Sequence, residues 1–201
     1  MSCCLVRPRW RWGQELYLGN DDLNDRANAL LRPARPRFED LSADSGADIS
    51  RFTMGVASGD LDENGLPDLV ATDIGREALL LQTEPGRLDE QAASRGFGRD
   101  SAGSGQGSIT WGVALADFDN DGDLDAYAAG GALGRDRVDQ DDALYLNDGA
   151  GRFDQRRVRA AGSGRTVAAA DWDRDGDVDL LVAQLGGSPL LLENRGRLPD
   201  G

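Results

Sequence analysis

Short apolar runs, each about the length of a β-strand, alternate along this chain with acidic or glycine-rich segments. Residues 109–116, 126–129, 143–147 and 152–154 are such runs, and an Asp-Gly pair at 148–149 favours a tight hairpin turn. Runs of this length bounded by turn residues are typical of β-strands. The pattern therefore predicts a unit of four short strands, in which an acidic loop joins the first two.

The same order of runs recurs elsewhere in the chain. Residues 52–86 and 166–193 repeat it, and residues 15–41 contain part of it. We expect the longer stretches 91–108 and 130–142 to be loops between strands. We predict five divisions of the chain. Residues 1–13 are unassigned and expected to be disordered or an artefactual start, and residues 14–50 form a partial unit. Residues 51–107 and 108–163 each form a unit with an acidic loop, and residues 164–201 form an incomplete one.

Each acidic loop has nine residues with one shared pattern. We name residues 60–68, 117–125 and 171–179 loop one, loop two and loop three. Loops two and three have Asp at positions 1, 3, 5, 7 and 9 and Gly at position 6, whereas loop one has Asn64 at position 5 and Leu66 at position 7. Successive loops begin 57 and 54 residues apart, which indicates a structural repeat. Carboxylates at this density repel one another unless a cation binds them.

Calcium is the cation that suits this pattern. It takes six to eight oxygens from carboxylates, amides and backbone carbonyls at about 2.3–2.6 Å, and a glycine at position 6 lets the loop turn around it. We predict one ion in each loop, about three in all, bound by the side chains at positions 1, 3, 5 and 9 and by the carbonyl at position 7. The predicted side-chain ligands are Asp60, Asp62, Asn64, Asp68, Asp117, Asp119, Asp121, Asp125, Asp171, Asp173, Asp175 and Asp179. The predicted carbonyl ligands are those of Leu66, Asp123 and Asp177.

The three loops should differ in their affinity for calcium, and a fourth segment upstream of them should not bind calcium. Loop one has three ligand carboxylates against four in each of the others, so it should bind calcium most weakly. Taking Glu15 as position 9 of an upstream loop puts Arg7, Arg9 and Arg11 at positions 1, 3 and 5. Three arginines cannot bind calcium.

The composition narrows the class of partner. The formal net charge is −14, and the three loops account for −13 of it. Such acidity argues against nucleic acid as a partner. No apolar run reaches the roughly 18 residues of a membrane span. All 22 basic residues are Arg, which together with abundant Ala, Gly and Asp suggests a GC-rich bacterial genome.

Two other classes of protein need comparison with the calcium-loop interpretation. An EF-hand begins with the same acidic pattern, but it requires a bidentate Glu at position 12 and a helix on each side. Position 12 is Ala71, Ala128 and Val182 in the three loops. An enzyme is disfavoured because the chain has no His to serve as base for a nucleophile, and metal binding accounts for the candidate acids. We therefore expect no catalysis by this chain.

Position 2 of each loop is apolar, with Leu61, Phe118 and Trp172 in chain order. This position points away from the ion, so we expect it to pack between neighbouring units. A role in stacking on a carbohydrate is the alternative.

The unit at residues 108–163 resembles a known family of repeats. Residues 111–116, loop two and residues 143–153 together resemble an FG-GAP/VCBS repeat, the repeat of the integrin alpha-chain propeller. The spacing is most similar to the subgroup with cartilage acidic protein and the ASPIC/UnbV proteins, and the resemblance covers roughly residues 14–196. It implies a β-propeller of about seven four-stranded blades, with calcium in the loop joining the first two strands of a blade. It also implies extracellular adhesion or ligand binding.

We therefore expect an all-β fold, a partial β-propeller of about three and a half four-stranded blades with calcium loops. The expected function is that of a non-catalytic module in extracellular adhesion or in binding a protein or glycan ligand. The alternative is a calcium-stabilised accessory or substrate-binding part of a larger secreted enzyme. Because so few blades do not close a ring, further partners would be the remaining blades of a parent propeller or a second chain. The repeat type implies an extracellular or secreted location, although the chain as given has no signal peptide.

Overall fold

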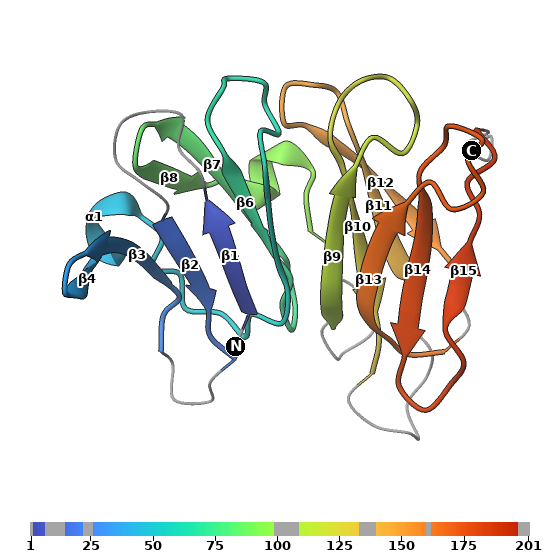
Figure 1. The fold of residues 1–201 in the computed structure, drawn as a ribbon, viewed down its shortest axis with the longest axis horizontal. Coiled ribbons are helices and arrows are strands. Elements are labelled where there is room, and N and C mark those ends of the chain that lie inside the picture. The colour runs from blue at the N-terminus through green and yellow to red at the C-terminus, as the bar shows by residue number, and fades with distance from the viewer. Residues whose placement is uncertain are drawn as a thin grey trace.

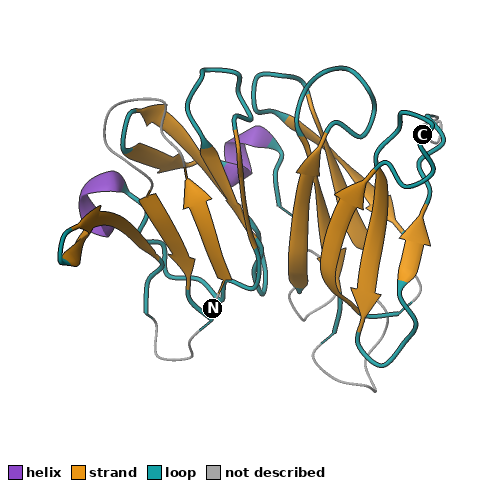
Figure 2. Ribbon diagram, in the orientation of Figure 1, coloured by secondary structure: helices purple, strands orange, loops and turns teal. Residues whose placement is uncertain are grey.

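The computed structural model describes residues 2–6, 15–21, 26–98, 109–132, 140–159 and 162–196. These residues form four antiparallel sheets, of four, four, four and three strands, and neighbouring strands in each sheet are consecutive in the chain. Figure 1 shows the sheets following one another from the blue N-terminal end to the red C-terminal end, and Figure 2 shows how little helix accompanies them. The predicted all-β fold and partial propeller architecture are confirmed.

Each sheet corresponds to one blade. The first contains β1 (Ser2–Val6), β2 (Glu15–Gly19), β3 (Ala29–Ala34) and β4 (Arg37–Asp40). The second contains β5 (Val56–Gly59), β6 (Asp68–Ala71), β7 (Ala78–Glu84) and β8 (Arg87–Glu90). The third contains β9 (Thr110–Ala116), β10 (Asp125–Gly130), β11 (Asp142–Asn147) and β12 (Phe153–Val158). The fourth contains β13 (Gly164–Ala170), β14 (Asp179–Gln184) and β15 (Leu190–Leu192).

The first sheet differs from its predicted form. Ser2–Val6 forms β1, which pairs with β2 along its whole length, so the expectation of disorder does not hold for these five residues. These residues precede an arginine-rich stretch instead of an acidic loop, so they did not match the pattern of the other units, and their pairing with β2 identifies the strand. The other residues of 1–13 lie outside the described residues. Residues 14–50 hold three strands of this sheet, and β1 completes it as a four-stranded one.

Two short helical segments connect sheets. They are α1 (Ser42–Ser45), after the first sheet, and the 3-10 helix η1 (Ala92–Arg95), after the second. We expected residues 91–108 to be a loop, and four helical residues are too few to show the periodicity of a helix. Residues 99–108 lie outside the described residues, as do residues 133–139 of the other expected loop. None of the helices in the described residues has the length and apolar character of a membrane span.

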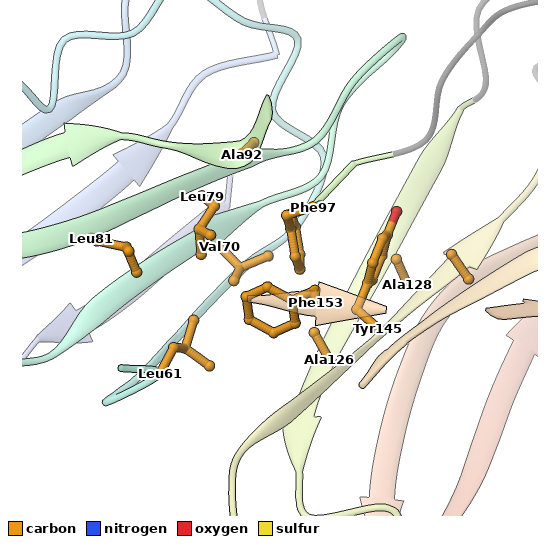
Figure 3. Close-up of a cluster of buried hydrophobic side chains, with 11 residues drawn as sticks. Leu61, Val70, Leu79, Leu81, Ala92, Phe97, Ala126, Ala128, Tyr145 and Phe153 are labelled. Carbon is orange, nitrogen blue, oxygen red and sulfur yellow. The ribbon is translucent and has the colours of Figure 1, made fainter. Parts of the chain in front are cut away.

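Neighbouring sheets pack face to face, with their first strands adjacent. β5 lies against β1 and β9, and β9 also lies against β13. Figure 3 shows the core between the second and third sheets, where Leu61 and Val70 meet Tyr145 and Phe153. Phe97, just beyond η1, stacks on Tyr145 with ring centroids 4.3 Å apart. The apolar faces of the sheets therefore stabilise the stack, and loop one contributes Leu61 to this core.

Candidate metal sites in the three acidic loops

The three acidic loops lie at the same edge of the structure, the upper edge in Figure 1. They join β5 to β6, β9 to β10, and β13 to β14. Gly65, Gly122 and Gly176 at position 6 have φ angles of 85°, 101° and 103°, and position 4 has φ angles of 54°, 63° and 65°. Positive φ is readily available to glycine but strained for most other residues. The two positive-φ positions curl each loop back on itself.

This curl brings together the side chains at positions 1, 3 and 9 of each loop. In each such group, one carboxylate oxygen from every residue lies within 4.8 Å of the others. Two oxygens on opposite sides of one calcium ion would be about 4.6–5.2 Å apart, twice the calcium–oxygen distance. The spacing therefore fits three ligands of a single ion. The groups are Asp60, Asp62 and Asp68; Asp117, Asp119 and Asp125; and Asp171, Asp173 and Asp179.

Several oxygens in these groups lack a hydrogen bond. Within the described part of the chain, Oδ1 of Asp60, of Asp62 and of Asp119 is buried without a hydrogen-bond partner. A buried carboxylate oxygen without a partner is costly, and a metal ion would remove that cost. The residues present therefore fit a bound cation.

The position 9 side chain is buried and ties each loop to its sheet. In loop two, Oδ2 of Asp125 accepts a hydrogen bond from the Phe118 amide at 2.9 Å, and its Oδ1 accepts one from the Asn147 amide at 2.8 Å. Asp68 and Asp179 accept the corresponding pairs of bonds at 2.7 to 3.0 Å. Each carboxylate oxygen has a second lone pair that remains available to a metal. Position 9 thus links the first two strands to the third and leaves lone pairs that could bind a metal.

Burial makes two of these carboxylates, Asp68 and Asp125, harder to ionise. The pKa of Asp68 is raised to about 7, chiefly by burial and to a smaller extent by the neighbouring charge of Asp62, against two backbone hydrogen bonds that lower it. Burial likewise raises the pKa of Asp125 to about 6, where the charge of Asp119 contributes. A divalent cation at the same place would favour the ionised form of every one of these groups.

Positions 5 and 7 have a different environment. The Oδ1 atoms of Asn64, Asp121 and Asp175 accept hydrogen bonds from the position 7 amides at 2.7, 3.0 and 3.0 Å. These contacts fix the turn, and Asp121 and Asp175 are not among the three converging carboxylates of their loops. Coordination by position 5 stays a prediction. So does coordination by the carbonyls of Leu66, Asp123 and Asp177.

An asparagine at or just after the end of the third strand of a blade has a role that our sequence analysis missed. Nδ2 of Asn147 donates to the carbonyl of Leu61 in the preceding loop at 2.8 Å, and Nδ2 of Asn194 donates to the carbonyl of Phe118 at 2.8 Å. Loops two and three also touch, because Nδ2 of Asn120 donates to a carboxylate oxygen of the next loop at 2.8 Å. The recurrence of Asn at the same place in two units was the available signal.

Position 2 divides the loops into two kinds. Leu61 and Phe118 are buried and pack against the following sheet, in the manner expected from the sequence. Trp172 is exposed.

In the first sheet, Glu15 at position 9 pairs with Arg32 at 3.1 Å, so a cation of the chain itself neutralises this carboxylate.

Comparison with protein families adds one finding. Residues 132–182 match the model of an FG-GAP-like repeat. The chain contains an FG-GAP-like repeat. The match runs from just after β10 to β14, so this repeat includes all of loop three. A search of curated proteins found no match.

Proposed function

We propose that this protein is a non-catalytic, calcium-binding module of propeller blades that binds a protein or glycan outside the cell. The supporting observation is the convergence of three carboxylates in each of three successive loops. Each ion would join the first two strands of a blade, and through position 9 it would also act on the third. Its role is structural, because the ion offsets the repulsion that the loop otherwise carries.

The donor set favours calcium over other divalent ions. Each group consists of carboxylates on an exposed, curled loop, and the FG-GAP-like repeat contains neither His nor Cys. Zinc prefers nitrogen and sulfur ligands, and magnesium prefers tight octahedral sites that retain several waters. Calcium accepts more oxygens with less demanding geometry.

An extracellular location follows from the same chemistry. Extracellular calcium modules bind with dissociation constants of about 10⁻⁴–10⁻³ M, which loops this exposed could reach without a rigid cage. The partner would contact the outer loops and strands, since the faces between neighbouring sheets are used in packing.

The test is calorimetric titration of the full chain with calcium, repeated with magnesium. We expect about three calcium sites and a melting temperature that rises with calcium and falls with a chelator. Asp62→Asn, Asp119→Asn and Asp173→Asn should each remove one site. Asp48→Asn is the matched control, because Asp48 is exposed and lies outside the loops. Absence of binding, or loss of a site in the control, would contradict the proposal.

A further inference from the structure

The inner sheets bury one set of apolar positions that the fourth sheet exposes. In the second sheet the set consists of Leu61 at loop position 2, Val70 in β6 and its cross-strand partner Leu79 in β7. All three are fully buried against the third sheet (Figure 3). These residues form the face that a blade turns toward the blade that follows it in the chain.

The third sheet repeats this arrangement. Phe118 at loop position 2 and Tyr127 in β10 are buried, and Leu144, the cross-strand partner of Tyr127, packs against the same cluster. The cover is the fourth sheet, which contributes Leu180 and Val182 of β14.

The fourth sheet has the same three positions without a cover. Trp172 is 72% exposed, Leu181 is 45% exposed, and its cross-strand partner Leu191 is 47% exposed. Among the described residues no sheet lies against them. We call these three residues the tail face. Large apolar side chains gathered on one exposed surface indicate an interaction site.

The first sheet exposes the opposite side of a blade. Leu80 in β7 and Tyr145 in β11 are fully buried on the faces that the second and third sheets turn toward the preceding sheet. Leu31 in β3 occupies the position equivalent to Leu80 and Tyr145. Each of these residues pairs with the residue that directly follows loop position 9 in its sheet. Leu31 is nevertheless only partly buried.

The fourth strands show the same contrast. Leu88 and Phe153 are buried. Their cross-strand partners are the residues two places after Leu80 and Tyr145. Phe38 has the equivalent place in β4, paired with Pro33, and is 57% exposed. We call Leu31 and Phe38, with Leu16 beside Leu31, the head face.

We propose that the tail face binds the head face of a second copy of this chain. The contact would repeat the packing that the chain already makes between its second and third sheets, with the same positions on each side. One chain supplies both halves, so the contact is head-to-tail rather than symmetric about a single patch. Two copies would bring eight sheets together, within the range of about four to eight blades found in propellers. The proposal uses sheet faces alone and does not depend on the calcium role.

The test is the mass of the full chain in solution, measured by light scattering and sedimentation over a range of concentrations in calcium. We expect a mass of two chains or more. Phe38→Asp and Trp172→Asp should each weaken association by about 30-fold or more, as loss of a central interface residue does. Both side chains are exposed in the single chain, so melting temperatures at low concentration should be unchanged. Ala93→Asp adds the same charge at an exposed residue of η1 and should leave the mass unchanged.

Mixing the two variants distinguishes this contact from a symmetric one. The Phe38→Asp chain keeps its tail face and the Trp172→Asp chain keeps its head face, so an equimolar mixture should regain a species of two chains. A monomeric wild-type chain would overturn the proposal. So would a Phe38→Asp chain that still associates with itself, or a mixture that stays monomeric.

Discussion

Gly122 has a φ of 101° at position 6 of loop two, and a Cβ there would meet no atom within 4 Å. The need for glycine is therefore conformational and not steric. We expect Gly122→Ala to cost about 1–3 kcal/mol of stability and to weaken calcium binding at loop two. Gly187→Ala is the control, because Gly187 is exposed, has no positive φ and would contact only the side chain of Gln184. Equal losses for both variants in denaturant melts would contradict this explanation.

Asp68 makes the metal-free protein sensitive to pH. Burial raises its pKa to about 7, above the value of about 3.9 for an unfolded Asp. The folded state therefore holds this proton more tightly, and the stability it contributes is complete below about pH 4 and lost as the pH rises through about 7. Metal-depleted protein should melt at lower temperature as the pH rises through this window. Asp68→Asn should flatten the dependence, and calcium should reverse it; a melting temperature that rises with pH in the metal-depleted wild type would refute the assignment.

At the scale of the element, loop and strand act together through an asparagine at the end of the third strand. Asn147 is buried, and its Nδ2 bonds the carbonyls of Leu61 and Leu124 at 2.8 and 3.0 Å. Asn147→Ala leaves buried acceptors unpaired, so we expect a loss of about 1–3 kcal/mol. Asn194→Ala removes the same kind of bond in a more exposed place and should cost less. Chemical denaturation of the two variants makes the comparison, and an equal or larger loss for Asn194→Ala would contradict it.

The loops should also fill in a definite order. Loop one has neutral Asn64 at position 5, whereas loop two has Asp121 there, so loop two should bind calcium more tightly. Titration of Asp62→Asn, which removes loop one, should delete the weaker of these two sites. Asp119→Asn should delete the stronger. The order is refuted if the Asp62→Asn protein loses the higher-affinity transition.

The sequence predicted those elements that carry a repeated local signal. The strands that begin at Asp68, Asp125 and Asp179 and the curl around Gly122 follow from the nine-residue pattern. β1 was missed because the stretch between it and β2 is rich in arginine and lacks the acidic loop that marks the other units. The link from Asn147 to the preceding blade was missed because spacing within one loop does not report which carbonyl lies opposite.

At the scale of the whole molecule, each sheet in the described part of the chain packs against its neighbours in sequence, so the effect of a mutation should depend on which faces are covered. Leu79 and Leu191 occupy equivalent positions in the second and fourth sheets, and they differ in cover. Leu79 is fully buried, so Leu79→Ala should cost about 2–5 kcal/mol through the cavity it leaves. Leu191 is 47% exposed, so the same truncation should cost well under half as much in the single chain.

The concentration dependence of this matched pair tests both the stack and the association of copies. If the tail face is covered by a second copy, Leu191→Ala should lower the melting temperature more at high protein concentration, because folding and association are then linked. The loss caused by Leu79→Ala should stay the same at every concentration, since its cover is within the chain. Melts at two concentrations differing by about 100-fold would separate the cases, because that ratio shifts a linked equilibrium by about 2.7 kcal/mol. Equal, concentration-independent losses at the two positions would mean that a covered face and an open face contribute alike, which the repeat architecture does not allow.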